Sequence, residues 1–296
     1  MIDKLELLLA LAKERHFGRA AEACGVTQPT MSTSQQLEEI LGVMLVQRGS
    51  RFQGFTPEGE RTLDWARRIV GDARAMHQEI NSLKDKLSGE IRIAAIPTVL
   101  GMVASLTTPF RARHPDVRFR VVSCTSAEVL GLLENLEVDA GLTYIENEPI
   151  GKVRTISLYK ESYRLLTSPD GMFGDREQVT WKEVGQVPLC LLTPDMQNRR
   201  IIDRALRSVG AEATPSLTSN SLLVLYTHVK TGRWASVMPA KLAETLGLAD
   251  RVRSIPIVDP VVTYSIGMVI PQRDPMTPLI AALVQIAREV APVLES

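Results

Sequence analysis

The sequence of 296 residues predicts an α/β protein of several domains: a winged helix-turn-helix, a long linker helix, and a two-lobed C-terminal part. Three observations predict it. Two short helices meet at a tight turn near the N-terminus, apolar residues then recur at heptad spacing, and strands alternate with helices in the remainder. With 45% hydrophobic residues, the chain can bury several separate cores. We place the divisions at residues 1–56, 57–87 and 88–296.

The stretch from His16 to Ser32 has the composition of two helices that cross closely. Alanines dominate its first helix, and Gly25 can take the positive φ that a short connecting turn needs. Thr27 is the expected N-cap of the second helix, with Pro29 in its first turn. An apolar face that can cover this pair from behind consists of Leu5, Leu8, Leu9 and Ala12.

The second helix carries amide and hydroxyl side chains suited to base edges and phosphates in a DNA major groove. A turn-rich segment, residues 47–56, then predicts a two-stranded wing whose arginines approach the DNA backbone or minor groove. A plain helical hairpin and a solvated loop are the alternatives. Because 34 basic residues balance 34 acidic ones, DNA affinity must come from local placement and dimerisation. The polar face comprises Gln28, Thr30, Ser32, Thr33, Gln35 and Gln36.

Residues 56–60, Thr-Pro-Glu-Gly-Glu, have the start chemistry of a long helix: an N-cap, a proline and acids in the first turn. Apolar residues follow at alternating spacings of three and four. Such a seam needs a partner helix, whereas a helix packed on its own domain shows a wider stripe. We therefore expect a homodimer that presents two recognition helices to a roughly two-fold symmetric DNA site. The seam consists of Ala66, Ile69, Ala73, Met76, Ile80, Leu83 and Leu87.

From residue 88, alternating strand and helix patterns predict parallel sheets with crossover helices. Two lobes fit the pattern: lobe I at about 90–162 plus 266–296, and lobe II at about 163–265. A ligand site is expected between them, where strands end and helices begin. Hydroxyl and amide residues there can bind carboxylates or other small anions, although each can equally be a plain helix N-cap.

The N-terminal motifs resemble those of the LysR-type transcriptional regulators, and the match is dense over residues 1–87. The motifs read AAE-x-C-x-V-T-Q-P-x-M-S, L-E-E-x-L-G-V-x-L, R-G-S-R and F-T-P-E-G-E. The resemblance implies a periplasmic-binding-protein-like effector domain, a homotetramer, promoter DNA as partner, and RNA polymerase as a further partner of an activator. On this basis the predicted DNA-contacting residues are Thr27, Gln28, Pro29, Thr30, Ser32, Thr33, Gln36, Arg48 and Arg51.

The same resemblance selects candidates for the effector site. The effector is expected to be a small anion, with no cofactor and no metal. A weaker similarity to regulators of formate dehydrogenase operons makes formate a candidate. Trp234 stands where the family has a glycine, so the effector site is expected to be narrower, or its wall displaced, on the lobe II side. The effector-binding candidates are Pro97, Thr98, Val99, Thr125, Ser126, Asn198, Asn220, Met238 and Pro239.

The recognition helix departs from the family pattern, which has an apolar residue four positions after Met31 and a leucine seven after it. Here Gln35 and Glu38 occupy those positions and the leucine is Leu37, as though one residue were missing. Each residue turns a helix by about 100°, so either local unwinding or a different set of DNA-facing residues is expected. The family's basic residue at the Thr33 position is also absent. The alternative function is a cytosolic small-molecule binding protein with impaired DNA readout.

Other classes of protein are disfavoured. The four histidines are scattered, and neither a GxSxG motif nor a Gly-rich phosphate loop is present, so no catalytic constellation is recognised. No signal peptide or apolar run of membrane length is seen, which argues against a solute-binding protein and predicts a cytoplasmic protein without membrane contact. Cys24, Cys124 and Cys190 lack CxxC spacing and predict reduced, mostly packed thiols, with a redox pair as the lesser alternative.

Overall fold

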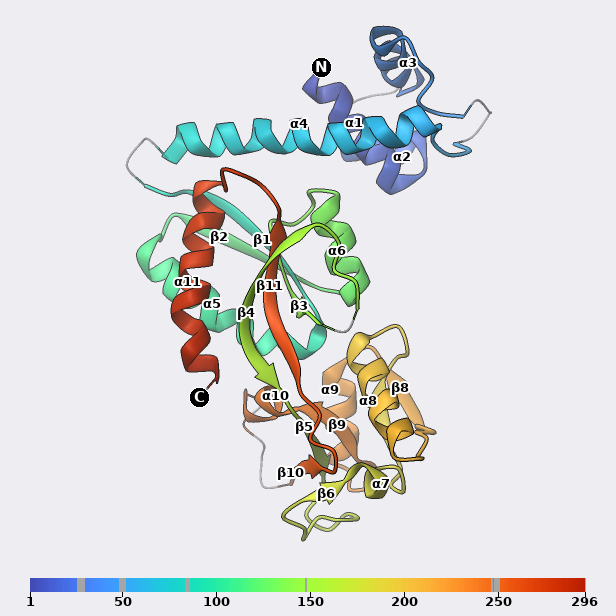
Figure 1. Ribbon diagram of the computed structural model, residues 1–296, viewed down its shortest axis with the longest axis vertical. Coiled ribbons are helices and arrows are strands. Elements are labelled where there is room, and N and C mark those ends of the chain that lie inside the picture. The colour runs from blue at the N-terminus through green and yellow to red at the C-terminus, as the bar shows by residue number, and fades with distance from the viewer. Residues whose placement is uncertain are drawn as a thin grey trace. The chain divides into compact units, whose positions relative to one another are not determined.

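The computed structural model describes residues 1–25, 30–47, 52–82, 86–146, 148–245, 247 and 251–295, with the backbone alone for 30–35, 78, 81 and 82. The chain divides into two compact units, each described here by itself (Figure 1). Unit 1 comprises Met1–Leu87, Glu134–Glu137 and Pro275–Pro278, and unit 2 comprises Ser88–Leu133, Val138–Asp274 and Leu279–Ser296. Among the described helices, none is long and apolar enough to cross a membrane.

Unit 1 begins with the predicted helical pair and the helix behind it. Helix α1 spans Ile2–Glu14, α2 spans Phe17–Ala23 and α3 spans Thr30–Leu41. The turn after α2 has Gly25 at φ +67°, as its glycine predicts. The expected apolar face of α1 is confirmed, because its leucines lie in the core of the unit. That core comprises Leu5, Leu7, Leu8, Leu9, Leu11, Ala20, Leu37, Leu45, Val46, Leu63, Ala66 and Val70.

Helix α3 shows how the shifted leucine is accommodated. Leu37 is only 1% exposed and packs in the core, while the Glu38 carboxylate accepts backbone N–H bonds from Leu45 at 2.7 Å and Val46 at 3.1 Å. The backbone is α-helical throughout Thr30–Leu41, so the expected unwinding after Met31 is not found there. The other alternative, a different set of DNA-facing residues, stays a prediction.

The segment after α3 forms the base of the predicted wing. Val46 and Phe55 make an antiparallel bridge, and the Gln47 backbone N–H donates to the Gly54 carbonyl at 2.9 Å. Of the predicted DNA-contacting residues, Gln36 is exposed, and its side-chain carbonyl accepts a hydrogen bond from the Lys4 ammonium. Those that lie outside the described residues are Thr27, Gln28, Pro29, Arg48 and Arg51.

Helix α4, Pro57–Ser82, begins as predicted, with the Thr56 hydroxyl accepting a hydrogen bond from the Gly59 backbone N–H at 3.0 Å. Its apolar residues divide between two faces. One face, which includes Ala66, is buried in the core of unit 1, so Ala66 does not belong to the expected seam. Leu87 lies beyond the end of the helix, and Leu83 lies outside the described residues. The exposed row on the other face is Trp65, Ile69, Met76 and Ile80.

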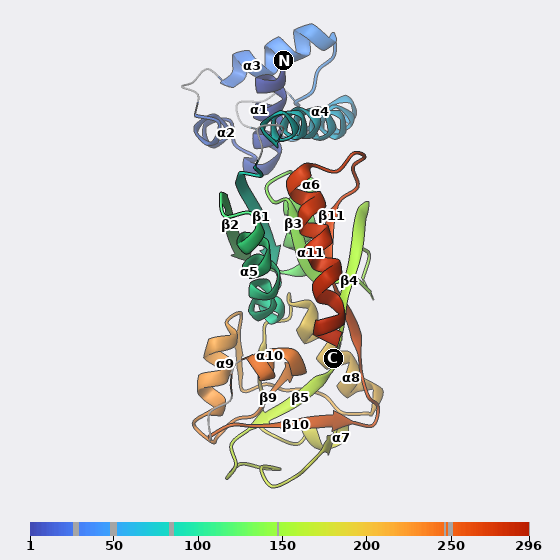
Figure 2. The same cartoon turned by 90° about the vertical axis from the view of Figure 1, so that its left-hand side faces the viewer.

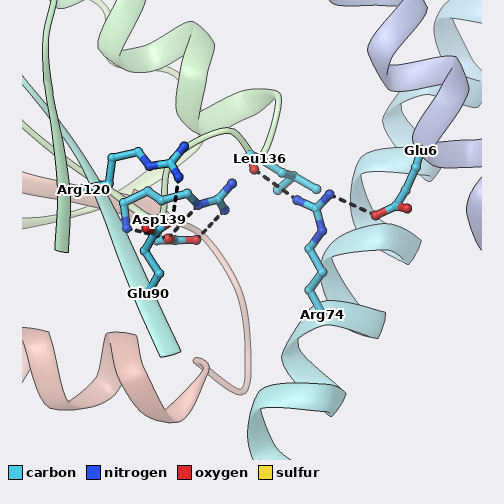
Figure 3. A network of polar contacts seen from close by, with 7 residues as sticks. Glu6, Arg74, Glu90, Arg120, Leu136 and Asp139 are labelled. Atoms are coloured by element: carbon cyan, nitrogen blue, oxygen red, sulfur yellow. Dashed lines mark hydrogen bonds and ion pairs between the residues drawn. The ribbon is translucent and has the colours of Figure 1, made fainter. Parts of the chain in front are cut away.

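A polar contact also fixes α4 within unit 1. The Arg74 guanidinium donates to the Glu6 carboxylate of α1 at 3.0 Å and to the Leu136 carbonyl at 3.2 Å, as Figure 3 shows. A guanidinium can serve both acceptors because its donors point in fixed, separate directions. Arg74 therefore links α4 to two other segments of the same unit.

In unit 2, lobe I is built on a five-stranded sheet of order β2-β1-β3-β11-β4. Helices α5 (Val103–Arg113) and α11 (Pro278–Glu295) lie on one face and α6 (Ser126–Glu134) on the other, as Figure 1 shows. The expectation of a parallel sheet is only partly correct, because β11 runs antiparallel to β3 and β4. A 3-10 turn, Pro97–Met102, leads into α5. The strands are β1 (Gly89–Ala95), β2 (Val117–Ser123), β3 (Ala140–Tyr144), β4 (Val153–Glu161) and β11 (Tyr264–Pro271).

Lobe II contains a four-stranded sheet of order β6-β10-β5-β9 and a parallel pair, β7 and β8. The expected parallel arrangement is wrong for the central strand, since β5 runs antiparallel to both β9 and β10. Figure 2 shows helices α8, α9 and α10 around these strands. The strands are β5 (Tyr163–Thr167), β6 (Val179–Thr180), β7 (Cys190–Leu192), β8 (Leu217–Ser219), β9 (Ser236–Pro239) and β10 (Arg253–Val258). The helices are α7 (Trp181–Val184), α8 (Gln197–Ser208), α9 (Leu222–Val229) and α10 (Ala240–Thr245).

Two crossovers connect the lobes. The chain leaves lobe I between β4 and β5, with Ser162 alone between the two strands, and returns through residues 259–263 between β10 and β11. Glu161 and Tyr264 pair across β4 and β11 at the point where both crossovers meet the sheet of lobe I. This arrangement explains two antiparallel pairs. The chain passes from β4 into β5 and returns from β10 into β11, so β10 runs opposite to β5 and β11 runs opposite to β4.

Candidate functional site

The loops after β1 and β2 meet at one edge of the lobe I sheet. Backbone hydrogen bonds of 3.1 Å from Ile96 to β3 and from Cys124 to β1 align these strand ends. Thr98 and Ser126 lie immediately after them, and both side chains are buried. Neither hydroxyl has a hydrogen-bond partner of standard geometry among the described residues. Buried hydroxyls are normally paired, so two that are not indicate a place where a ligand or water can bind.

Tyr144, the last residue of β3, connects this edge to lobe II. Its hydroxyl lies 3.1 Å from the Tyr163 hydroxyl of β5 and accepts a hydrogen bond from the Asn198 side-chain amide of α8 at 3.2 Å. Burial raises the pKa of Tyr144 to about 12, although the hydrogen bonds with Asn198, Tyr163 and Thr98 lower it. Because the phenol stays neutral, it can both donate and accept. We call Thr98, Tyr144, Tyr163 and Asn198 the junction cluster.

Further contacts join the start of α8 to the loop after β3. The Gln197 side-chain amide donates to the Glu146 carbonyl at 3.4 Å, and Arg200 binds Glu148 through two contacts of 2.8 Å. The Glu146 carboxylate in turn accepts from the Ser265 backbone N–H and hydroxyl, which hold its pKa below its ordinary value. These contacts position Asn198 beside Tyr144, because they lie on either side of it along α8.

Several predicted effector-binding residues have other uses in the structure. The Thr125 hydroxyl caps α6, accepting from the Glu128 backbone N–H at 3.2 Å, while the Glu128 carboxylate accepts from the Thr125 N–H at 2.8 Å. The capping explanation therefore holds for Thr125. Asn220 is exposed on the surface, and the Met238 side chain is packed in the lobe II core. Pro239 is paired with Tyr163 in the sheet.

The remaining candidates are brought to the junction. Pro97 and Val99 are buried on either side of Thr98, and Asn198 donates to Tyr144. Trp234, expected to alter the wall of the site, packs against the lobe II core with its ring 5.3 Å from the His228 ring.

Cationic side chains and metal ligands were also considered. Arg199 is buried near the junction, but it binds Asp203 at 2.8 Å and the Leu192 carbonyl at 2.9 Å. Its guanidinium is therefore already engaged. In the described part of the chain, no group of three or more His, Cys, Asp or Glu residues is placed to hold a metal ion.

The three thiols differ in exposure and are all free. Cys190 is buried and Cys124 is partly buried, while Cys24 is exposed, contrary to the expectation of packed thiols. Burial raises the pKa of Cys124 and of Cys190 to about 11. The pKa of Cys24 is also raised, first by partial burial and then by Glu6. A reactive thiol needs a lowered pKa, so none of these sites activates its sulfur.

Sequence reasoning missed three buried residues at the junction: Tyr144, Glu161 and Tyr163. Tyr144 could have been found, because it ends a strand-like stretch, residues 138–144, that leads to the expected ligand site. Glu161 could not, because its surroundings depend on the pairing of β4 with the distant strand β11. Burial raises the pKa of Glu161 to about 7, against the opposing effects of the Lys241 backbone N–H and the Tyr159 hydroxyl.

Two family models match the chain. Residues 84–292 match the "LysR substrate binding domain", and residues 2–60 match "Bacterial regulatory helix-turn-helix protein, lysR family".

Two curated relatives match this chain over most of their length. The "DNA-binding transcriptional dual regulator OxyR" of Escherichia coli K12 is 27% identical over 93% of this chain and 90% of its own. The "Probable nitrogen assimilation transcriptional activator" of Synechococcus elongatus is 26% identical over 97% and 94%. These two relatives do not confirm the weaker similarity to regulators of formate dehydrogenase operons.

Solved structures share the fold. A variant of full-length OxyR from Pseudomonas aeruginosa has a TM-score of 0.76 at 23% identity, covering 99% of this chain and 96% of that one. Full-length CbnR in complex with its target DNA has a TM-score of 0.62 at 19% identity, covering 98% and 100%.

Proposed function

Because the chain belongs to the LysR family of bacterial transcriptional regulators, we propose that a small anionic metabolite bound at the junction cluster controls its action on promoters. The protein is a DNA-binding regulator with a C-terminal effector-binding domain. The observation that carries the proposal is the buried Thr98 hydroxyl, which has no partner of standard geometry among the described residues, in the junction cluster with the Tyr144–Asn198 hydrogen bond. The Ser126 hydroxyl, at the end of the neighbouring strand, is buried in the same condition.

The donors at this site favour a small acceptor ligand. Hydroxyl and amide groups donate readily to a carboxylate, and residues from both lobes contribute them. Arg199 is engaged elsewhere, so recognition rests on neutral donors. A single carboxylate can be held by several neutral donors at once, whereas a second carboxylate would need donors of its own. Formate is the smallest carboxylate that fits this description.

Titration calorimetry of the full chain tests the effector class. Formate, acetate and a dicarboxylate are titrated beside their neutral amides. Binding of a carboxylate that Asn198→Leu weakens by about tenfold supports the site, since an amide-to-carboxylate hydrogen bond contributes about 1.5 kcal/mol or more. Asn220→Leu, an exposed asparagine in the same lobe, is the matched control. Heat from the neutral compounds alone would refute an anionic effector.

DNA readout is tested separately. Fluorescence anisotropy is measured with duplexes from upstream of the protein's own gene, over a salt series, for wild type, Gln28→Ala and the exposed control Gln186→Ala. Selective binding with a steep salt slope that Gln28→Ala alone weakens supports base readout by the shifted recognition helix. Weak binding that ignores sequence would favour the alternative, a small-molecule binding protein with impaired readout.

The exposed row on α4 supports a homodimer through the linker helix. Trp65 is 61% exposed and Ile80 is 50% exposed, and with Ile69 and Met76 they follow one side of the helix. Large apolar side chains in such a row are typical of a helix with a missing partner. Met76→Asp is expected to lower the mass measured by light scattering, while His77→Asp, the adjacent exposed position, leaves it unchanged. Pairing of dimers into a tetramer, and contact of an activator with RNA polymerase, belong to the same proposal.

Several relatives carry the name "Hydrogen peroxide-inducible genes activator". A thiol-based response to peroxide is the second function this raises, and it is the redox alternative named above. The raised pKa of Cys124 and of Cys190 disfavours it here, because the thiolate is the nucleophile that peroxide oxidises.

A further inference from the structure

Glu161 lies where both chain crossovers between the two lobes of unit 2 meet the lobe I sheet. It ends β4, one residue before β5 begins in lobe II, and it pairs with Tyr264, where the returning crossover enters β11. Any rotation of one lobe against the other must be absorbed by these two crossovers, since they are the covalent connections between the lobes. The surroundings of the Glu161 carboxyl therefore change whenever the lobes move.

The carboxyl is buried without adequate partners. The Glu161 residue is 1% exposed. Its Oε1 atom accepts one long hydrogen bond of 3.4 Å from the Lys241 backbone N–H, and its Oε2 atom has no hydrogen-bond partner of standard geometry among the described residues. The Tyr159 hydroxyl acts on the carboxyl without making a well-formed hydrogen bond. A carboxylate in such a place is poorly solvated, so burial favours the neutral carboxyl.

No positive side chain of the described residues forms an ion pair with this carboxyl. The Lys241 ammonium is directed to Glu244 at 3.6 Å. Its other neighbours include phenols. Burial is the main cause of the raised pKa of Tyr159 and of Tyr163, and the charge of Glu161 raises both further. The titratable groups that face it are Tyr144 from β3, Tyr159 from β4, Tyr163 from β5, Tyr264 from β11, and Lys241 and Glu244 from α10.

We propose that Glu161 is a proton switch of the interlobe hinge, protonated while the lobes are packed as described and ionised when they separate and water reaches it. A neutral carboxyl suits the buried site, whereas a carboxylate is better solvated in an open one, so ionisation and opening favour each other. Raising the pH therefore shifts the lobes toward the open arrangement. The inference goes beyond the effector proposal, because it needs neither effector nor DNA.

Hydrogen exchange of the full chain, without ligand, tests this directly. Peptides covering residues 160–164 and 259–264 are compared with peptides from β1 in the same protein, between about pH 5 and pH 8. The measured quantity is the exchange rate of the crossover peptides in wild type divided by the rate in Glu161→Gln. As the pH increases, this ratio is expected to rise about tenfold or more and to level off above about pH 7. Glu212→Gln, which alters an exposed carboxyl of lobe II that does not face Glu161, is expected to follow wild type.

An equal pH response in wild type and Glu161→Gln would overturn the proposal. Should the variant fail to fold, wild type alone decides, because the crossover peptides must change relative to β1 over this pH range. A constant ratio between them excludes the switch. Failure here leaves the effector titrations unaffected, and failure of every carboxylate to bind leaves the hinge measurement interpretable.

Discussion

Two pairs of threonine and glutamate in unit 2 are used in opposite ways. Thr125 and Glu128, at the start of α6, satisfy each other's backbone through two hydrogen bonds of 3.2 and 2.8 Å. Thr98 and Glu161, near the lobe junction, are buried, and each keeps an oxygen without a partner of standard geometry in the described structure. The first pair stabilises its helix. The second costs stability and keeps polar atoms available for other purposes.

This contrast shows where structure can be separated from function at a strand end. Capping of a helix accounts for a pair such as Thr125 and Glu128, and an N-cap stabilises a protein by about 1 kcal/mol. An unsatisfied buried group needs another explanation, and function is a frequent one. Measurements that change one member of each pair can break or sharpen the distinction.

The largest effect is expected at Glu161. Its pKa is raised to about 7 in the folded protein, so folding binds a proton between about pH 4.5 and 7, and stability falls as the pH rises through that range. Glu161→Gln removes this loss. The variant is expected to be more stable than wild type by about 3 kcal/mol at pH 8 and nearly equal near pH 5, as an upper limit from the pKa difference.

Urea unfolding at the two pH values measures this difference. Glu128→Gln is the control from the satisfied pair, and it should lose a small amount of stability at both values because its carboxylate accepts a backbone N–H. A Glu161→Gln variant less stable than wild type at pH 8 would mean that the carboxylate has an unrecognised stabilising partner.

The second effect concerns the hydroxyl at the centre of the junction cluster. Tyr144→Phe removes the group that pairs with Asn198 and Tyr163, leaving both buried and unpartnered, which is expected to cost about 2 kcal/mol. Tyr226→Phe, on a partly exposed tyrosine of α9, is expected to change stability by less than about 0.5 kcal/mol. Equal midpoints in urea for the two variants would show that the junction hydrogen bonds contribute little to folding.

Local elements of the fold were predictable and the junction was not. The turn at Gly25, the leucines of α1 and the cap at Thr56 follow from short-range patterns, because a cap or a helical face is decided within a few residues. The antiparallel direction of β11 and the burial of Glu161 depend on pairing between β4 and β11, which lie more than a hundred residues apart in the sequence. Ala66 shows the same limit, since its heptad position does not reveal that the unit's own core covers it.

A smaller effect separates the two threonines. Thr125→Val removes the α6 cap and is expected to cost about 1 kcal/mol with little change in effector binding. Thr98→Val removes a buried hydroxyl without a well-formed partner, so stability should change by less than about 0.5 kcal/mol while effector affinity falls. Thermal unfolding and calorimetry on both variants measure the pair. The reverse pattern would make Thr125 the ligand contact and Thr98 the structural residue.

The smallest effect is expected at Cys124, which directly precedes Thr125. With a pKa raised to about 11 by burial and then by Glu128, only about a thousandth of this thiol is ionised at pH 8. Its reaction with iodoacetamide, followed by mass spectrometry, should therefore be far slower than that of a free cysteine, and Cys124→Ser should not change DNA binding before or after peroxide treatment. Rapid modification of Cys124 in the folded chain would show that the loop after β2 opens. The Ser126 hydroxyl in the same loop would then be exposed to water rather than buried.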